Sequence, residues 1–290
     1  MNSRIVVKHQ RVSVWGLPSG IDGLRIAHVS DLHFRAWGPL YAQTQQLLAG
    51  LTYDMLAVTG DFSDRPGRWR KTAEWCRRFF EPLRPPLGTY AVLGNHDDPR
   101  LGRVTDLPLT WLNDESTVPP GGPGRLRVAG ICQNVPGAGR IAHALAEAGE
   151  DEAVILLTHY PSAIYAVPAG RVQLLLAGHT HGGQVRFPFL GALWTNDRLP
   201  RGMARGLHLV GKTWLHVNPG IGVSFPLRAR IMCHREITVL ELRRVEGSRN
   251  QHDATDTDAL ACVSDNFTRR EAAEVLLSGA ACPAGRTGVG

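Results

Sequence analysis

The stretch with the clearest chemical potential is Gly178–Gly183, which carries two histidines, His179 and His181, one residue apart. It follows the apolar run Val172–Ala177, which is typical of a buried strand. Histidines at alternate positions on a turn can aim their ring nitrogens into one space, and flanking glycines let the backbone turn sharply. Histidine is also a very common metal ligand. The pattern suggests a metal site, although such a pair also occurs in ordinary polar loops.

Four further sets of polar residues each follow a short apolar run in the same way. Ligands of open α/β sheets bind at the edge formed by the carboxyl ends of the strands, so we expect these side chains to meet at one edge. The runs and their polar residues are Leu24–Val29 with Asp31 and His33, Met55–Thr59 with Asp61, Tyr90–Leu93 with Asn95 and His96, and Ala153–Leu157 with His159.

Together these positions offer seven nitrogen and oxygen donors, namely Asp31, His33, Asp61, Asn95, His159, His179 and His181. Since no cysteine is among them, the set favours manganese, iron, zinc or magnesium over soft metals. Seven donors exceed the four of a structural zinc site but suit two cations that share a bridging carboxylate. Two such cations, about 3.5–4 Å apart, ionise a water near neutral pH and clamp an in-line displacement at phosphorus.

A displacement of this kind also needs a proton donor for the departing oxygen. His96 stands beside the candidate ligand Asn95, so its imidazole is placed to supply that proton. Asp64 follows Asp61 by three residues, and we expect its carboxylate to orient the His96 ring as the acid of a catalytic triad orients its histidine.

The five motifs, in this order, resemble the signature of the calcineurin-like metallophosphoesterase family, which is D-x-H, G-D-x-x-D, G-N-H-[DE], a single H, and G-H-x-H. In this chain they read Asp31-Leu32-His33, Gly60-Asp61-Phe62-Ser63-Asp64, Gly94-Asn95-His96-Asp97, His159 and Gly178-His179-Thr180-His181. No motif is missing, and the resemblance spans residues 5–243 of the sequence.

The resemblance implies a fold, a cofactor and a role for each residue. The fold would be α/β (α+β), a four-layer αββα sandwich with two mixed β-sheets flanked by helices. The cofactor would be two divalent metal ions, with manganese favoured among Mn, Fe, Zn and Mg. By matching positions, Asp31, His33 and His181 would bind the first metal, Asn95, His159 and His179 the second, and Asp61 both; His96, paired with Asp64, would assist the leaving group.

The extended first and last motifs look most like the YkuE/YaeI-type phosphodiesterase branch, whose chlamydial-type relatives act as UDP-2,3-diacylglucosamine pyrophosphatases. We therefore expect hydrolysis of a phosphodiester or pyrophosphate bond in a small-molecule or lipid-nucleotide substrate. A phosphomonoesterase is an alternative, because Gly60–Arg65 resembles the protein-phosphatase motif in which the arginine binds phosphate. Solvent exposure of Arg65 is the competing interpretation. A non-catalytic scaffold of the same fold is disfavoured by the complete ligand set.

The composition indicates the class of the protein and its expected location in the cell. The chain has 290 residues, of which 43% are hydrophobic and 20% charged, and lacks an apolar run of about 18 residues that could span a membrane. The N-terminus has no apolar signal region, and the five cysteines are scattered, so we expect a cytoplasmic protein. Peripheral contact with the inner membrane face is an alternative, through the apolar loop Phe187–Trp194, which otherwise caps the core.

The net charge of +6 favours anionic partners, yet no motif or patterned basic helix supports nucleic-acid binding. The sequence does not indicate the oligomeric state.

The chain divides into a metallophosphoesterase domain, residues 1–246, and a C-terminal tail, residues 247–290. In the domain, alternating strands and helices followed by β-rich sequence predict two central sheets with helices outside. We expect helices over residues 39–51, 68–80 and 140–148, and antiparallel strands over 184–187, 206–210, 213–217 and 235–242. In the tail, Thr268–Glu271 is a capping-box pattern that opens a short helix, and the final residues are expected to be disordered.

Overall fold

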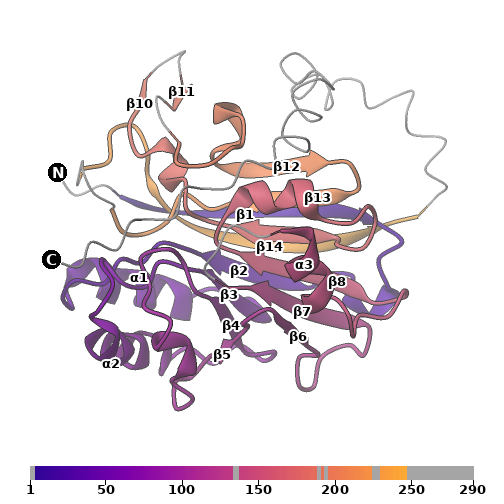
Figure 1. Ribbon diagram of the computed structural model, residues 1–290, viewed down its shortest axis with the longest axis horizontal. Helices are drawn as coiled ribbons and strands as arrows, with labels where there is room; N and C mark the ends of the chain where they lie inside the picture. Colours follow the sequence, from indigo (N-terminus) through magenta and orange to yellow (C-terminus); the bar gives the residue numbers. More distant parts are fainter. Residues whose placement is uncertain (1–3, 133–136, 188–190, 193–194, 224–228, 247–290) are drawn as a thin grey trace, which may run out of the picture. The chain divides into compact units, whose positions relative to one another are not determined.

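Two six-stranded β-sheets, packed face to face, form the centre of the part of the chain that the structure describes (Figure 1). This computed structural model describes residues 4–132, 137–187, 191–192, 195–223 and 229–246. The first sheet has the order β1 (Ile5–Trp15), β14 (Arg235–Val245), β2 (Arg25–Val29), β3 (Met55–Thr59), β4 (Thr89–Val92) and β5 (Thr110–Trp111). The second has the order β12 (Gly206–Val210), β13 (Thr213–Val217), β9 (Leu174–Ala177), β8 (Ala153–Thr158), β7 (Leu126–Ile131) and β6 (Glu115–Thr117).

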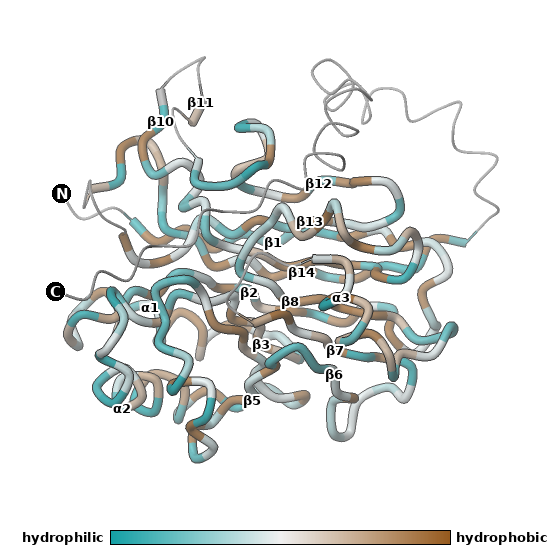
Figure 2. The backbone as a smooth tube through the Cα atoms, in the orientation of Figure 1, coloured by the Kyte–Doolittle hydropathy of each residue, from teal (hydrophilic) through white to brown (hydrophobic). Residues whose placement is uncertain are grey.

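The central strands are apolar on both faces because both faces are covered. In β8, Ile155 and Leu157 point into the core between the sheets, whereas Val154 and Leu156 point into the core on the outer side. Such strands appear in the sequence as unbroken apolar runs rather than as alternating patterns. Figure 2 shows this hydrophobic character along β3 and β8.

Helices cover the outer face of each sheet. On the first sheet, α1 (Pro39–Ala49) and α2 (Trp69–Phe80) bury side chains such as Leu48 and Phe79 against Val58 of β3. On the second sheet, α3 (Ala138–Ala144) and the 3₁₀-helix η3 (Pro161–Ala166) cover the other outer face. The layers are therefore helix, sheet, sheet, helix (Figure 1), which confirms the expected αββα sandwich.

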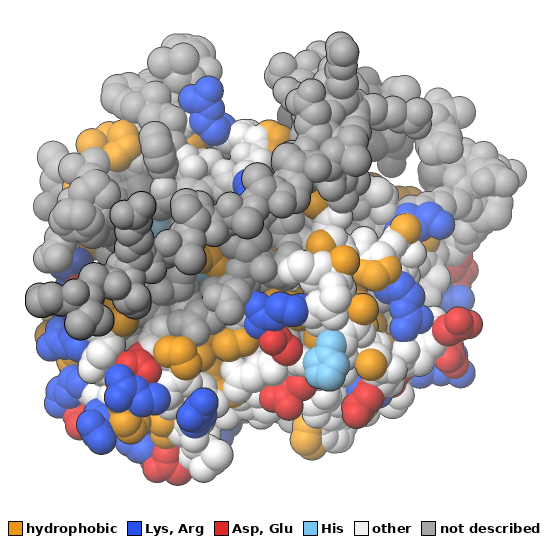
Figure 3. Space-filling model, viewed as in Figure 1, with side chains coloured by type: hydrophobic (Ala, Val, Ile, Leu, Met, Phe, Trp, Pro, Cys, Tyr) orange, Lys and Arg blue, Asp and Glu red, His pale blue; other side chains and the backbone are white. Residues whose placement is uncertain are grey.

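The charged surface over α1 and α2 is mixed in sign. On the face shown in Figure 3, Lys and Arg side chains are interspersed with Asp and Glu side chains. Two ion pairs involve α2 residues, Arg77 with Asp106 at 2.7 Å and Lys71 with Glu74 at 2.5 Å. On this face, the described charged side chains over α1 and α2 do not form a single-sign basic stripe of the kind that nucleic-acid binding uses.

Several predicted elements differ in detail from the structure. The first two helices lie where expected, whereas the strands after residue 184 are not all antiparallel. Strand β13 is antiparallel to β12 but parallel to β9, and β14 is parallel to β1 while antiparallel to β2. A residue pattern reports which faces of a strand are buried but not the direction of its neighbour, so this part of the prediction was wrong.

Some predictions fall on residues outside the described part of the chain. They include the tail 247–290 with its short helix, and residues 188–190 and 193–194 of the apolar loop. The domain boundary at residue 246 stays a prediction. The structure contains, among the residues it describes, no helix long and apolar enough to cross a membrane.

We expect Gly130 of β7 to be essential for the approach of the two sheets. A Cβ atom at this position would lie 2.7 Å from Cγ1 of Val92 and would also collide with Leu112, both on the side of the first sheet. Gly130→Ala should therefore lower the stability by about 1–3 kcal/mol, measured as a lower thermal midpoint. The matched control is Gly139→Ala in α3, where a Cβ meets nothing within 4 Å. Equal midpoints for the two variants would contradict this view of the interface.

Candidate metal centre

The strand ends bring the seven candidate ligands to one edge of the sandwich. Strands β2, β3 and β4 are parallel in the first sheet, and β8 and β9 are parallel in the second. Each delivers its polar residues just past its C-terminal end, as predicted. The residues and the strands that they follow are Asp31 and His33 after β2, Asp61 after β3, Asn95 after β4, His159 after β8, and His179 and His181 after β9.

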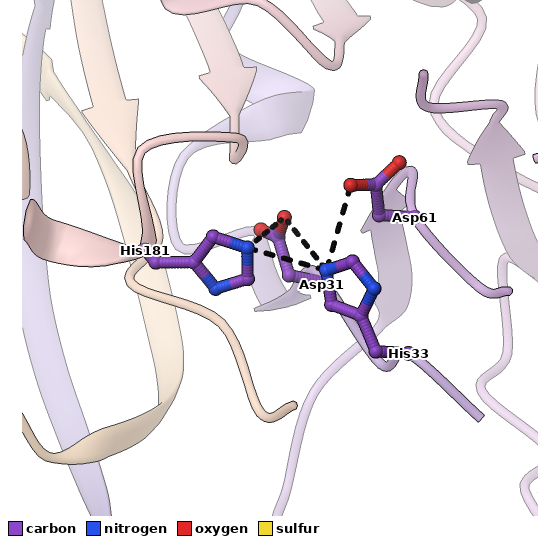
Figure 4. A group of neighbouring side chains, drawn as sticks. All are labelled: Asp31, His33, Asp61 and His181. Atoms are coloured by element: carbon purple, nitrogen blue, oxygen red, sulfur yellow. Dashed lines mark hydrogen bonds and ion pairs between the residues drawn. The ribbon is translucent and has the colours of Figure 1, made fainter. Parts of the chain in front are cut away.

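Asp31, His33, Asp61 and His181 form a buried group that we call the first cluster (Figure 4). One ligand atom from each residue lies within 4.8 Å of those of the other three. Nε2 of His33 is 3.2 Å from Nε2 of His181 and 3.5 Å from Oδ2 of Asp61. Nε2 of His181 is 3.5 Å from Oδ1 of Asp31. The four side chains thus point into one small volume.

Asn95, His159 and His179 form a group that we call the second cluster, which contacts Asp61 through His159. Nε2 of His159 lies 3.4 Å from Oδ2 of Asp61, 3.0 Å from Oδ1 of Asn95 and 3.2 Å from Nδ1 of His179. The same oxygen of Asp61 therefore contacts a histidine of each cluster.

Three of the four cluster histidines aim their outer ring nitrogen at a backbone carbonyl. Donation of the outer N–H to a carbonyl leaves the inner nitrogen with a free lone pair facing the cluster, which is the usual arrangement of histidine metal ligands. The pairs are His33 Nδ1 with Ser63 O at 3.2 Å, His159 Nδ1 with Thr59 O at 2.8 Å, and His179 Nε2 with Asn196 O at 2.9 Å. His181 differs, because its Nδ1 lies 3.4 Å from Nη2 of Arg230.

The backbone at the site is strained. Five of the ligands have a positive φ although they are not glycine, a conformation that costs of the order of 1–3 kcal/mol each. They are Asp31 (51°), His33 (46°), Asp61 (55°), His179 (69°) and His181 (50°). Such strain is retained where surrounding contacts impose it, and it turns these side chains inward.

Two glycines allow the first-sheet loops to approach the ligands. A Cβ on Gly60 would lie 2.6 Å from Nδ1 of His159, and one on Gly94 would collide with the Asp61 carboxylate. Gly60 also has a φ of 87°, which favours glycine. The glycines of the G-D and G-N motifs are therefore required by close packing around Asp61.

The buried carboxylate of Asp97 joins two of the ligand loops. Its Oδ1 accepts from the backbone N–H of Ser63 at 2.7 Å, and its Oδ2 accepts from those of Phe62 at 3.2 Å and Gly94 at 2.9 Å. Asp97 thus fixes the loop after β3 against the loop after β4. Its place in the G-N-H-D motif was visible in the sequence, but its role was not.

His96 lies half-buried at the rim of the site. Its backbone N–H donates to Oδ1 of Asp61 at 2.9 Å, and its ring Nδ1 lies 3.2 Å from the backbone carbonyl oxygen of Asp64. The Asp64 carboxylate lies elsewhere, accepting from Nε of Arg35 at 2.7 Å. The sequence predicted that the Asp64 carboxylate would orient His96, and this was wrong: Asp64 contacts the His96 ring through its backbone carbonyl.

Two arginines flank Asp64 differently. Arg35 pairs closely with its carboxylate, whereas the Arg65 side chain is 65% exposed and approaches Oδ2 of Asp64 only to 4.0 Å. Sequence reasoning singled out Arg65 and missed Arg35, although Arg35 follows His33 by only two residues.

Burial controls the protonation of the cluster. It lowers the pKa of His33 and His179 to about 4 and that of His181 well below its usual range, so these imidazoles are neutral at pH 7. Burial, assisted by nearby Asp61 and opposed by His159, raises the pKa of Asp31 to about 6. Neutral imidazoles and a carboxylate ionised at pH 7 are the forms that bind metal ions.

Asp61 and His159 act as an ion pair. Burial disfavours ionisation of Asp61, but His159, which is also its hydrogen-bond partner, holds the pKa of Asp61 well below its usual range. Burial likewise disfavours the charged form of His159, yet Asp61 raises the His159 pKa to about 10. A cation bound between them would replace the proton that this pair shares.

The residues fit a divalent cation. Oδ1 of Asp31 is buried and has no hydrogen-bond partner among the described residues, although it points into the first cluster. An unpartnered buried carboxylate oxygen is costly, and a cation at this position would satisfy it. The oxygen and imidazole donors are those preferred by manganese, iron, zinc and magnesium.

Comparison with known proteins agrees with this site. The family model of the calcineurin-like phosphoesterases matches residues 24–183. The metallophosphoesterase YkuE of Bacillus subtilis is 28% identical over 238 residues, covering 78% of this chain and 82% of YkuE. Phosphodiesterase YaeI of Escherichia coli is 28% identical over 238 residues, covering 75% and 82% of the two chains. The UDP-2,3-diacylglucosamine pyrophosphatase LpxG of Chlamydia trachomatis is 38% identical over 88 residues, 29% of this chain and 26% of LpxG.

A sandwich fold with a buried Asp/His cluster at one edge and a match over more than half of the chain define a metal-binding hydrolase of phosphoesters. The chain belongs to the calcineurin-like phosphoesterase family. Its family and its cluster support metal-dependent hydrolysis of a phosphoester bond.

We expect metal binding to tighten as the pH rises. Below about pH 6 Asp31 is protonated, and at higher pH the proton shared by Asp61 and His159 must still leave before a cation binds. The affinity for Mn²⁺ should therefore rise by about tenfold or more between pH 5.5 and 7.5. Calorimetric titrations in two buffers of different ionisation enthalpy measure the affinity and count the released protons. An affinity independent of pH would contradict this assignment.

Proposed function

We propose that the protein hydrolyses a phosphodiester or pyrophosphate bond with two divalent cations, of which manganese is favoured. The observation that carries this proposal is the position of Asp61, whose Oδ2 lies 3.5 Å from Nε2 of His33 and 3.4 Å from Nε2 of His159. One carboxylate oxygen shared by two sets of donors is the arrangement expected of a bridging ligand. The first position would be bound by Asp31, His33 and His181, and the second by Asn95, His159 and His179.

The residues around the cations have separate tasks. When bound, the two cations supply a hydroxide at neutral pH and neutralise charge on the phosphoryl oxygens. His96 lies at the rim and provides a proton for the departing oxygen. Its Nδ1 lies 3.2 Å from the Asp64 carbonyl oxygen, and donation of an Nδ1–H to that oxygen fixes the orientation of the imidazole. Arg35 neutralises the Asp64 carboxylate beside it.

A diester or pyrophosphate substrate is favoured over a monoester. The relatives YaeI and LpxG are named as a phosphodiesterase and a pyrophosphatase, and the match to YaeI covers most of both chains. The monoesterase alternative depends on Arg65 as a phosphate ligand. That side chain is mostly exposed, whereas Arg35 is engaged by Asp64. The donor set is complete and, apart from the exposed Asn95, buried, which disfavours a non-catalytic scaffold.

A lipid-linked nucleotide is the second candidate substrate, and one surface feature favours it. The side chains of Ile231 and Met232 are 47% and 59% exposed. They lie close to the turn that carries His179 and His181, because Ile231 forms an isolated β-bridge with Val185, four residues after His181. Exposed apolar residues beside such a site suit an acyl chain or the membrane face. This reading supports a cytoplasmic protein in peripheral contact with the inner membrane, and release of UMP from UDP-2,3-diacylglucosamine tests it.

We expect replacement of Asp61 and replacement of His96 to have different effects on metal content and on activity. Asp61→Asn should lose bound metal and with it most activity, because it weakens both positions at once. His96→Gln should keep its metal, while kcat falls by about 10²–10⁴-fold for substrates with poor leaving groups and less for nitrophenolate. Elemental analysis and steady-state kinetics of both variants provide the test. Full metal and full activity in Asp61→Asn would exclude Asp61 as the bridge.

Substrate class is tested by two chromogenic esters. With added manganese, kcat/KM for bis(p-nitrophenyl) phosphate should exceed that for p-nitrophenyl phosphate by at least about tenfold, a difference of roughly 1.4 kcal/mol in transition-state stabilisation. Preference for the monoester would favour the protein-phosphatase alternative. In that case Arg65→Ala should raise KM for the monoester.

A further inference from the structure

Among the described residues, His181 is the cluster histidine whose outer ring nitrogen faces a side chain, Arg230, and not a backbone carbonyl. Nη2 of Arg230 lies 3.4 Å from Nδ1 of His181, where the other three histidines have a backbone oxygen. Arginine can only donate hydrogen bonds, so it cannot replace a carbonyl acceptor. The role of Arg230 must therefore come from its other contacts.

The guanidinium of Arg230 is bound mainly by backbone carbonyls. Its Nε and Nη2 donate to the oxygen of Gly222 at 2.9 and 2.7 Å, and Nη2 also donates to the oxygen of Pro219 at 2.7 Å. Its Nη1 reaches His234 O at 3.5 Å. Among the described residues Arg230 makes no ion pair with a carboxylate, although the charge of Asp31 acts on it, so hydrogen bonds to backbone carbonyls fix this side chain.

The turn that Arg230 holds lies directly beneath Asp31. The backbone N–H groups of Ile221 and Gly222 donate to the oxygens of Ser30 at 3.0 Å and Asp31 at 2.6 Å. Gly220 has a φ of 79°, and a Cβ there would lie 2.6 Å from Cβ of Asp31. Any shift of the Pro219–Gly222 turn would therefore move the Asp31 carboxylate.

The segment that carries Arg230 also holds His181. Cys233 is buried, and its thiol donates to the backbone oxygen of His181 at 3.2 Å. A Cβ on Gly182 would lie 2.8 Å from Sγ of Cys233 and 3.0 Å from Cβ of Pro219, so three chain segments meet at this turn. Arg230 joins them, since Nη1 also approaches Sγ of Cys233 to 3.9 Å.

We propose that Arg230 is a positioning residue for the first metal position: it clamps the turn under Asp31 to the segment behind His181 and so sets the distance between these two ligands. The guanidinium touches neither ligand atom, and it is not a catalytic residue. This inference rests on the proposed metal-dependent function and adds to it a residue that no sequence motif contains.

The test measures metal affinity. Arg230→Met removes the clamp, and Arg230→Lys keeps the charge but cannot span the oxygens of Pro219 and Gly222 with one ammonium group. Both variants should bind Mn²⁺ about 10–100-fold more weakly at one of two positions, as is usual when a group supporting a metal ligand is lost. Equilibrium dialysis of the metal-free full chain, followed by elemental analysis, gives the stoichiometry and the affinities.

Arg127→Met is the matched control. The Arg127 side chain is also largely buried, 12% exposed, and bonds Glu152, which precedes β8 and so lies at the opposite edge of the second sheet. This variant should lower the thermal midpoint without changing Mn²⁺ affinity. The proposal is overturned if Arg230→Met or Arg230→Lys binds Mn²⁺ as tightly as the wild type, or if Arg127→Met weakens binding equally.

A measurement on the wild type covers the case in which the Arg230 variants do not fold. The Nε–H signal of Arg230 in nitrogen-15 spectra should shift when Zn²⁺ is added to the metal-free protein, and an unchanged signal would overturn the proposal. Failure of the proposed function gives a different result, because the wild type would then bind no metal and hydrolyse neither chromogenic ester.

Discussion

Two carboxylates, Asp31 and Asp61, lie fully buried within a few ångströms of four imidazoles, and the rest of the site depends on how their charge is compensated. Burying an ionised carboxylate without a partner is prohibitively costly. Asp61 obtains compensation from His159 and from the backbone N–H of His96, whereas Oδ1 of Asp31 has no hydrogen-bond partner among the described residues. Divalent cations bound here would satisfy both carboxylates and would use the lone pairs that the neutral histidines direct inward.

The strained backbone follows from this requirement. Asp31, Asp61 and His181 all have left-handed φ angles, and each such residue costs stability that the surrounding sandwich must supply. The apolar strands supply it, because both faces of each central strand are buried. Carbonyl acceptors for the outer nitrogens, and the Asp97 carboxylate between two loops, then restrict each ligand to one orientation.

The fold and the clustering of the candidate ligands were accessible from the sequence because they depend on patterns within short stretches. Apolar runs mark the strands, and the position of Asp61 or His159 directly after a run is enough to place it at the sheet edge. Contacts made by backbone atoms leave no comparable pattern in the sequence. The carbonyl of Asp64 binds His96 in place of the carboxylate, Arg35 takes up that carboxylate, and neither fact could be derived from residue types.

The direction of the late strands and the role of Arg230 were inaccessible for a related reason. Both depend on which segments meet in space after long connections. Strand β13 joins β9 in parallel only because the chain returns across the sheet after the metal-binding turn. Arg230 contacts carbonyls of Pro219 and Gly222, which any residue type presents, so a clamp of this kind leaves no motif.

The two halves of the site come from different sheets, and a buried polar contact between the sheets explains how they are kept in register. Nδ1 of His28 on β2 lies 2.8 Å from Nδ1 of His216 on β13, and Nε2 of His28 lies 2.9 Å from Oγ1 of Thr59 on β3. Burial lowers the pKa of both histidines, that of His216 to about 3, so each is neutral and one donates to the other.

An apolar core alone tolerates small sliding of one sheet over the other, whereas a hydrogen bond between buried polar groups does not, since its loss leaves both groups unsatisfied. Asn218 adds a second tie by donating to the backbone oxygen of His28 at 2.9 Å. Asp31 lies three residues beyond His28, and the carbonyl of Thr59 accepts from the ligand His159 of the second sheet. The polar contacts inside the sandwich thus set the separation of the ligands at its edge.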